Sequence, residues 1–362
     1  MADREVADAV RAALAGIEVP GGGTLADYSG LSEIIVTANA VAFAISVAPG
    51  MEKAFAPVRE AAAGVVAKAA SGRKPLISLT ADAPAPAAAK RTSRAAQAGR
   101  APPPPRQDVP GLKRILTVAS GKGGVGKSTT AVNLALALAE TGLKIGILDA
   151  DIYGPSLPRL LGIEGKPAVR ADGTFKPHEA FGLKVMSIGS MVEPGEAVVW
   201  RGPMATAALR QLLRETEWGE LDILVVDLPP GTGDVHISIC QQVPLAGAVI
   251  VSTPQDLALI DARKAVDMFR RLDIPVLGIV ENMSYFIAPD TGKRYDIFGH
   301  GGAETEAKTL GVPYLGGIPL DMVIRETSDA GTPVVASEPL GPRAGAYRAI
   351  ARAVLAHPAL AG

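Results

Sequence analysis

One short stretch of this 362-residue chain, GKGGVGKS from Gly121 to Ser128, constrains the fold more than any other feature. It matches the pattern G-x-x-x-x-G-K-[ST], with the apolar run ILTVAS before it and the helix-forming run KSTTAVNLALALAE at its end. Glycines let backbone N–H groups converge on phosphate oxygens, and the N-terminus of the following helix adds partial positive charge. The stretch therefore predicts a strand, a phosphate-binding loop and a helix, in that order.

Individual residues of this loop have distinct expected roles toward a nucleoside triphosphate. Lys127 is expected to reach the β- and γ-phosphates, and Ser128 to coordinate Mg²⁺. Lys122 is either a solvated loop lysine or a second cation that stabilises charge developing in phosphoryl transfer, as an arginine finger does. We therefore predict ATP and Mg²⁺ as ligands. The predicted nucleotide contacts in the loop are Gly121, Lys122, Gly123, Gly124, Val125, Gly126, Lys127, Ser128 and Thr129.

The remainder of the chain from residue 111 to 362 alternates short apolar runs with helical patterns. The runs RILTVAS, KIGILDA, LDILVVD, GAVIVST, PVLGIVEN and PYLGGIP are β-branched and continuously apolar, as strands of a buried parallel sheet are. Helical stretches such as LALIDARKAVDMFRRLD lie between them. This alternation predicts βαβ units and an α/β P-loop NTPase domain, built on a doubly wound, mostly parallel sheet.

Aspartates follow two of these predicted strands. Asp149 and Asp151 end the run KIGILDAD, and Asp227 ends LDILVVD. The carboxyl ends of parallel strands lie beside the ligand crevice, so we predict that Asp227 holds Mg²⁺, directly or through water. The GTGD sequence after Asp227 would approach the γ-phosphate with its backbone N–H groups. Asp149 is expected to support the residues that contact the ligand, without contacting the ligand itself. Each aspartate could instead cap a helix or form a turn.

The first 110 residues have a different composition. Residues 1–82 predict a small α+β domain, with helical, strand, strand, helical and strand patterns in that order. Residues 83–110 are dominated by Ala, Pro and Arg, include the prolines of 102–105, and contain almost no large apolar side chain. Such a segment buries too little surface to offset its ordering entropy, so we predict a disordered linker between two domains.

Charge and hydropathy exclude several other classes of protein. The net charge is −1, which gives no electrostatic case for a nucleic-acid binder. No run of about 18 apolar residues predicts a membrane span, and the N-terminus MADREVADAV lacks the apolar core of a signal peptide. We therefore expect a cytoplasmic protein whose partners include neither nucleic acid nor membrane.

Several motifs resemble those of known families. The sequence GKGGVGKST resembles the deviant Walker A motif of the ParA, MinD and nitrogenase iron-protein class. The stretches DADIYGPSLPRLLG, LDILVVDLPPGTGD, ENMSYF and YDIFGHGGA are together similar to the Mrp family, also called ApbC, over roughly residues 111–340. Residues 1–82 are similar to the small assembly-protein domain often fused to this family. The resemblance implies an ATP-hydrolysing iron–sulfur cluster carrier that transfers clusters to apo client proteins, works with iron–sulfur assembly proteins and forms a homodimer.

The same resemblance implies roles for individual residues. In this class, the lysine at Lys122 reaches the nucleotide of the partner subunit, and the aspartate at Asp151 polarises or orients the attacking water. Asn282, after the run PVLGIVE, stands where the class places an asparagine on the adenine, and the segment 318–321, IPLD, would form a further edge of that pocket. Asn282 and IPLD could equally be turn residues.

The cargo positions depart from the family pattern. Mrp proteins usually carry C-x-x-C in the loop after MSYF, and two such loops hold a [4Fe–4S] cluster between subunits; here these positions are Ala288 and Thr291. A methyl group cannot bind iron, and a neutral hydroxyl is a poor substitute for a soft thiolate. Cys240, the single cysteine, is either a buried small apolar residue, which we expect, or a metal ligand, and His300 is either a turn residue or a metal ligand.

No iron–sulfur ligand is assigned from the sequence. One hypothesis is a carrier whose ligands come partly from a partner or client protein. Another is a nucleotide-gated scaffold or chaperone that holds no cluster, and a third is a MinD- or ParA-like positioning ATPase.

Overall fold

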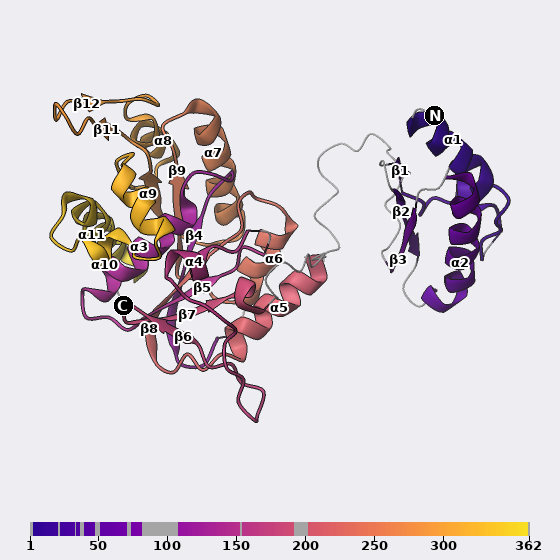
Figure 1. The fold of residues 1–362 in the computed structure, drawn as a ribbon, viewed down its shortest axis with the longest axis horizontal. Helices are drawn as coiled ribbons and strands as arrows, with labels where there is room; N and C mark the ends of the chain where they lie inside the picture. Colours follow the sequence, from indigo (N-terminus) through magenta and orange to yellow (C-terminus); the bar gives the residue numbers. More distant parts are fainter. Residues whose placement is uncertain are drawn as a thin grey trace. The chain divides into compact units, whose positions relative to one another are not determined.

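The computed structural model of the chain describes residues 3–20, 22–32, 34–36, 40–47, 51–70, 74–81, 108–152, 154–191 and 202–360. The chain divides into two compact units, Met1–Arg100 and Ala101–Gly362 (Figure 1). The linker predicted over residues 83–110 lies outside the described residues as far as residue 107, so its disorder stays a prediction.

The N-terminal unit is a three-stranded sheet packed with two helices. Its elements are α1 (Asp3–Leu14), the 3-10 turn η1 (Leu25–Asp27), β1 (Ile35–Val36), β2 (Ala40–Val47), α2 (Glu52–Ala69) and β3 (Lys74–Ala81). β2 pairs antiparallel with β1 and parallel with β3. Val10 of α1, Ile45 of β2 and Val66 of α2 are completely buried in one apolar core. The element order is the one that the sequence predicts.

The C-terminal unit contains an eight-stranded sheet of order β13-β10-β9-β4-β8-β5-β7-β6. Its strands are β4 (Leu112–Ala119), β5 (Ile145–Asp149), β6 (His178–Ala180), β7 (Leu183–Ser187), β8 (Leu221–Asp227), β9 (Gly247–Ser252), β10 (Val276–Glu281) and β13 (Tyr314–Gly317). Every pairing in this sheet is parallel except that of β6 with β7. The predicted α/β class and mostly parallel sheet are confirmed, whereas β6 and β7 were not predicted because both are short and contain charged residues.

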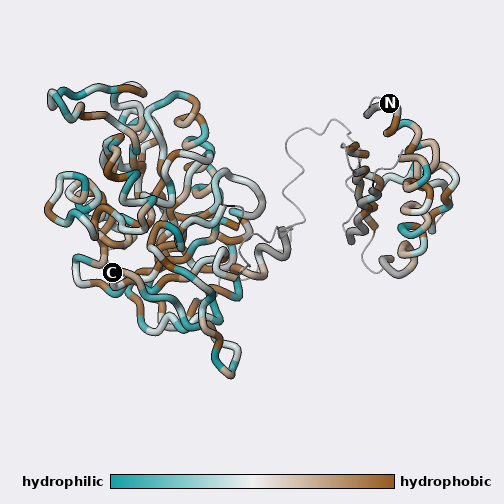
Figure 2. Tube along the Cα trace, viewed as in Figure 1, coloured by the Kyte–Doolittle hydropathy of each residue, from teal (hydrophilic) through white to brown (hydrophobic). Residues whose placement is uncertain are grey.

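Helices cover both faces of this sheet (Figure 1). One apolar core includes α5 (Gly202–Arg214), α6 (Asp234–Gln242), α7 (Asp256–Arg271) and α8 (Gly302–Leu310). The other includes α3 (Lys127–Ala139), α4 (Leu157–Leu160), α9 (Met322–Asp329), α10 (Val334–Ser337) and α11 (Pro342–Leu355). Neighbouring strand residues such as Leu224 and Val225 enter opposite cores, because successive side chains of a strand point to opposite faces. Figure 2 shows these strands as a hydrophobic interior.

The C-terminal unit also contains a short hairpin and 3-10 turns. A two-stranded hairpin, β11 (Phe286–Ile287) with β12 (Arg294–Tyr295), follows β10, and η2 (Ile188–Met191) and η3 (Pro358–Leu360) are 3-10 turns.

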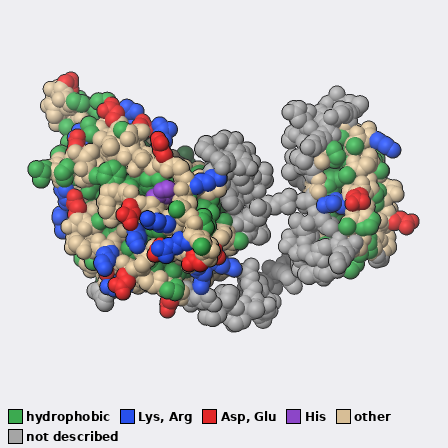
Figure 3. Space-filling model, turned by 60° about the horizontal axis from the view of Figure 1, so that its bottom comes forward, with side chains coloured by type: hydrophobic (Ala, Val, Ile, Leu, Met, Phe, Trp, Pro, Cys, Tyr) green, Lys and Arg blue, Asp and Glu red, His purple; other side chains and the backbone are tan. Residues whose placement is uncertain are grey.

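On the face of the C-terminal unit shown in Figure 3, basic and acidic side chains are interspersed. None of the helices in the described ranges has the length and apolarity that crossing a membrane requires.

The strand order reverses at the centre of the sheet. β4 lies between β8 and β9; the chain leaves β4 for β5 on one side and later crosses from β8 to β9 on the other. Ligands of open α/β sheets bind at such a reversal, outside the carboxyl ends of the strands. β4, β5, β8 and β10 all deliver predicted site residues to this edge.

Candidate functional site

The phosphate-binding loop joins β4 to α3, as the sequence predicts. Gly124 and Gly126 both have φ of +79°, a conformation that favours glycine. A Cβ on Gly121 would lie 2.2 Å from the backbone of Asp261 in α7, so only glycine fits where the loop begins. The loop is therefore held in shape by its glycines and by the close approach of α7.

Lys127 lies in a cluster of carboxylates. Its side chain is only 6% exposed, and its Nζ is 2.6 Å from Oδ1 of Asp227 and 3.8 Å from Oδ2 of Asp151. Nζ also donates a hydrogen bond to the hydroxyl of Ser128 at 3.2 Å. The structure thus brings the predicted residues of three different strand ends together. Phosphate oxygens bound by Lys127 would compete with Asp227 for the ammonium.

Asp227 has an oxygen atom suited to a cation. Its Oδ2 is buried and has no hydrogen-bond partner in the described part of the chain. Burial raises the pKa of Asp227, although the charge of Lys127 and hydrogen bonds from Lys127 and Ser128 oppose this. Mg²⁺ is usually bound by one or two carboxylates together with waters and phosphates, so the pair of Ser128 and Asp227 fits this ion. No group of three or more His, Cys, Asp or Glu side chains able to hold a metal occurs among the described residues.

Asp149 braces the loop that carries Asp151. Its Oδ2 accepts hydrogen bonds from the backbone N–H groups of Ser156 and Leu157 and from the hydroxyl of Ser187, at 3.0–3.1 Å. Its Oδ1 accepts from the N–H of Asp151 at 3.1 Å. Burial, together with the charge of Asp227, raises the pKa of Asp149 to about 7. These contacts agree with the supporting role expected for Asp149.

Asp151 faces the lysine from this braced loop. The residue is 7% exposed. Its Oδ1 accepts a hydrogen bond from the N–H of Gly154 at 3.2 Å, which leaves Oδ2 as the atom closest to Lys127. The carboxylate is therefore oriented by the backbone rather than by a second side chain.

Asn282 packs directly on the phosphate-binding loop. Its Nδ2 donates to the carbonyl of Val125 at 2.8 Å, and a Cβ on Gly126 would lie 2.1 Å from the same nitrogen. Met283 follows with φ of +55°, an uncommon conformation for a non-glycine residue. The structure places Asn282 at the nucleotide loop, while its predicted contact with adenine stays a prediction.

Glu281 holds this turn and was not predicted from the sequence. It is buried, and its Oε1 accepts from the hydroxyl of Ser284 at 2.5 Å while its Oε2 accepts from the N–H of Ala303 at 2.7 Å. The second bond satisfies a donor at the N-terminus of α8. The sequence did contain a signal for this role, because Glu281 ends an otherwise apolar strand run. A carboxylate that is buried at such a position needs hydrogen-bond partners.

The IPLD segment lines a cavity of about 380 Å³ next to this turn. Backbone bonds from Ser284 to Ile318 and from Leu320 to Tyr285 hold the two segments together. Polar groups in the wall are Asp321 and Arg343, which form an ion pair at 2.8 Å. The full lining is Tyr285, Phe286, Ile287, Pro289, Pro319, Asp321, Met322, Val323, Pro342 and Arg343.

Comparison with known proteins agrees with this geometry. The model of the ParA-type family described as NUBPL iron-transfer P-loop NTPase matches residues 111–355. The chain belongs to this family. The iron-sulfur cluster carrier protein of Deinococcus radiodurans is 54% identical over 246 residues, 67% of this chain and 69% of that protein. The iron-sulfur cluster transfer protein NUBPL of Mus musculus is 50% identical over 254 residues, 70% of this chain and 80% of that protein.

A solved structure supports the same assignment. The nucleotide-binding protein of Archaeoglobus fulgidus, solved in complex with ADP, is 42% identical, with a TM-score of 0.55 over 61% of this chain and 87% of that one. The predicted membership of the Mrp-type iron-transfer family is thereby confirmed. The relatives named as cluster carriers disfavour the alternative of a positioning ATPase.

In this member of the iron-transfer family, the cargo positions lie on the hairpin between β11 and β12. The N–H of Ala288 donates to the carbonyl of Lys293 at 2.9 Å, and the carbonyl of Ala288 accepts from Gly292 at 2.8 Å. The hydroxyl of Thr291 accepts from the N–H of Lys293 at 3.4 Å. Local hydrogen bonds therefore close the turn.

The other two candidate metal ligands are Cys240 and His300. Cys240 is completely buried in α6, as predicted for a small apolar side chain. His300 is exposed, and its Nδ1 lies 3.4 Å from Asp296 and 3.1 Å from the guanidinium of Arg294. The structure thus supports the reading of His300 as a turn residue with surface polar contacts.

Proposed function

We propose that this protein is a Mg²⁺-dependent, cytoplasmic ATPase that works as a homodimer in iron–sulfur cluster transfer to apo proteins. The observation that carries the proposal is the buried meeting of Lys127 with Asp227 and Asp151 at the start of α3, in a chain of the iron-transfer family. Such a cluster of one cation and two anions, at the mouth of a phosphate-binding loop, matches the parts that phosphoryl transfer needs.

The ion would be held by Ser128 and by Oδ2 of Asp227, and when bound it supplies charge neutralisation at the phosphates. Lys127 releases Asp227 and binds the β- and γ-phosphate oxygens. Asp151 orients a water molecule, whose oxygen attacks the γ-phosphorus while the bond from that phosphorus to ADP breaks. ADP and inorganic phosphate are the products.

The adenine would be received between Asn282 and the IPLD segment. The cavity beside IPLD has apolar walls, including Tyr285, Phe286 and Val323, and a few polar groups, which is the usual composition of a small-molecule site. Asn282, which follows β10, donates from its amide to the carbonyl of Val125 in the phosphate-binding loop.

The dimer would complete the site through Lys122. Within the described part of the chain, the side chain of Lys122 makes no hydrogen bond or ion pair, although its backbone carbonyl accepts from Ser120 at 2.9 Å. Because the ammonium of Lys122 forms no such bond within its own subunit, it is available to a nucleotide bound by a second copy of the chain. This supports the role that the family resemblance implies.

The cargo loop favours a second candidate function, a nucleotide-gated scaffold that holds no cluster itself. Ala288 and Thr291 supply no thiolate, and the only cysteine, Cys240, is buried elsewhere. A carrier with this loop must take thiolate ligands from a client or assembly partner, whereas a scaffold needs none.

Anaerobic reconstitution with iron and sulfide tests whether this chain holds a cluster with its own residues. The wild-type chain is compared with the double variant Ala288→Cys/Thr291→Cys, which restores C-x-x-C, and with Cys240→Ser. Bound iron and a visible absorption band in the wild type, with ATP hydrolysis, support the carrier. Iron only in the double variant contradicts a carrier that holds its cluster with its own residues, and iron in neither contradicts the assignment of this hairpin as the cargo loop. ATP turnover by the wild type is measured separately, and its absence contradicts the ATPase.

A further inference from the structure

A buried histidine that the sequence analysis did not single out lies beside the catalytic cluster. His236, in the first turn of α6, is 4% exposed. Its Nε2 is 2.7 Å from the carbonyl oxygen of Pro229, and its backbone N–H donates to the carbonyl of Gly233 at 3.0 Å. Because a carbonyl only accepts, Nε2 carries the hydrogen, and Nδ1 of the neutral ring is an acceptor.

Packing alone does not explain a histidine at this position. Nδ1 is buried and has no hydrogen-bond partner among the residues that the structure describes. Burial lowers the pKa of His236, so the ring is neutral at pH 7; the charge of Asp151 raises this pKa and that of Lys127 lowers it. An apolar side chain would fill the space without burying an unpaired acceptor, so the bond to Pro229 is the contribution that distinguishes histidine here.

The segment that His236 holds is the loop from Leu228 to Gly233, which connects Asp227 to α6. Its inner side is tied to the phosphate-binding region: the N–H of Leu228 donates to Val118 at 3.0 Å, and the N–H of Gly231 donates to Ser120 at 2.9 Å. The second bond means that the Gly231 N–H is already engaged and is not free for the γ-phosphate. The loop therefore joins the end of β4 to the first turn of α6.

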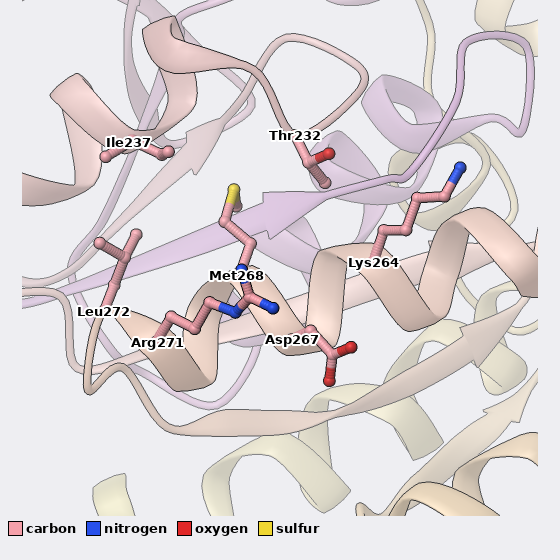
Figure 4. A pocket seen from close by; sticks show the side chains of 7 residues that line it. All are labelled: Thr232, Ile237, Lys264, Asp267, Met268, Arg271 and Leu272. Carbon is pink, nitrogen blue, oxygen red and sulfur yellow. The ribbon is translucent and has the colours of Figure 1, made fainter. Parts of the chain in front are cut away.

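The outer side of the same loop is only partly packed. A cavity of about 280 Å³ lies between α6 and α7, with Thr232 of the loop and Ile237 of α6 on its wall (Figure 4). Met268 points from α7 into the space between them (Figure 4). Close packing, which elsewhere immobilises core segments, is incomplete on this side. The hydrogen bond from His236 thus restrains a loop that has room to move.

We propose that His236 is a positioning residue for ATP hydrolysis, which holds the Leu228–Gly233 loop against the catalytic cluster through its Nε2–H bond to Pro229. The inference rests on the proposed ATPase function. Small displacements of a catalytic constellation lower turnover steeply, whereas nucleotide affinity comes mainly from the phosphate-binding loop, with which His236 forms no hydrogen bond among the described residues. The expected signature is a loss in kcat without a matching rise in KM.

Substitution of His236 by glutamine or by asparagine retains a nitrogen at only one of the two ring-nitrogen positions. The amide nitrogen of glutamine stands near the place of Nε2 and can still donate to Pro229, whereas that of asparagine stands near Nδ1 and cannot reach it. We expect His236→Ala and His236→Asn to lower kcat by at least about 10-fold with KM for ATP within about 3-fold, and His236→Gln to keep kcat within about 3-fold of the wild type. Ile237→Val, the neighbouring residue, is the matched control and should behave as the wild type.

Turnover, KM, MgADP affinity and Tm are measured for all five proteins. Equal kcat values throughout would overturn the inference, and so would an equal loss in the glutamine and alanine variants. A loss of kcat that tracks Tm across the series would indicate a merely structural role and would also overturn it. If the wild type does not hydrolyse ATP, the failure lies with the proposed function, because the wild-type rate does not depend on the substitutions.

Discussion

The ammonium of Lys127 lies 2.6 Å from Oδ1 of Asp227, with side chains that are 6% and 0% exposed. This pair joins the first residue of α3 to the last residue of β8, across 100 positions of the chain. A buried ion pair contributes little net stability, but each partner compensates the other's desolvation. Under the proposed function, binding of nucleotide and metal would therefore exchange one set of compensating charges for another, rather than fill a neutral pocket.

Replacing Lys127 tests this relationship. Lys127→Met should abolish productive ATP binding, because the phosphates lose their lysine contact, and should lower the free energy of unfolding by about 1–3 kcal/mol, because Asp227 is left buried without its partner. The double variant Lys127→Met/Asp227→Leu should recover most of the stability but not the binding. Urea denaturation and titration calorimetry measure the two effects. A double variant as unstable as the single one would contradict the explanation by charge compensation.

Asp151 is tested by a substitution that keeps its size. Asp151→Asn should slow single-turnover ATP hydrolysis by about 100-fold while MgATP still binds, because an amide orients the attacking water less well than a carboxylate. Asp172→Asn, at an exposed turn, is the control and should leave the rate unchanged. Normal turnover in the Asp151 variant would remove this residue from the water-orienting role.

The raised pKa of Asp149 predicts a pH dependence of stability. A carboxyl group that binds its proton more tightly in the folded state contributes stability at low pH and loses that contribution as the pH rises through its folded pKa, here about 7. Between about pH 4 and pH 8, the wild type should therefore lose stability relative to Asp149→Asn. Urea midpoints across this range give the two curves. Parallel curves, or a slope of opposite sign, would show that Asp149 is ionised throughout.

Lys122 is predicted to act across a dimer. Lys122→Ala should bind MgATP with an affinity within about 3-fold of the wild type, yet fail to form the ATP-dependent dimer and hydrolyse ATP at least about 10-fold more slowly. Sedimentation velocity with a non-hydrolysable ATP analogue measures the association. The exposed Lys176 provides the control variant Lys176→Ala. Unchanged dimerisation with normal turnover would mean that Lys122 is only a solvated loop residue.

Two glycines of the same loop should respond differently to alanine. A Cβ on Gly121 would lie 2.2 Å from the backbone of Asp261, whereas the nearest atom to a Cβ on Gly123 is 3.9 Å away, on Pro230. Gly121→Ala should therefore lower the free energy of unfolding by about 1–3 kcal/mol, and Gly123→Ala should change it by less than about 0.5 kcal/mol. Urea denaturation of both variants checks this, and equal losses would argue against the close approach of α7.

The difference between predicted and unpredicted parts of the fold has a physical cause. The strands that become β4, β5, β8, β9, β10 and β13 were predicted because burial on both faces makes them continuously apolar. β6 and β7 escaped prediction, since β6 is the antiparallel edge strand and β7 includes Lys184, whose ammonium reaches the carbonyl of Trp218. An edge position tolerates polar residues, so β6 carries a weaker pattern, whereas β7 lies inside the sheet and its pattern is interrupted by Lys184.

The sequence by itself determined the phosphate-binding loop, the order of strands and helices around it, and the lack of thiols at positions 288 and 291, because these depend on local patterns and residue identity. Only the tertiary structure decided that Lys127 meets Asp227, that Glu281 holds the turn after Asn282, and that His236 holds Pro229. Such contacts join a side chain to a group that is distant in the sequence or lies in another element. The partner of each of these side chains depends on how β8, β10, α6 and α8 pack together. A local sequence pattern does not contain this information.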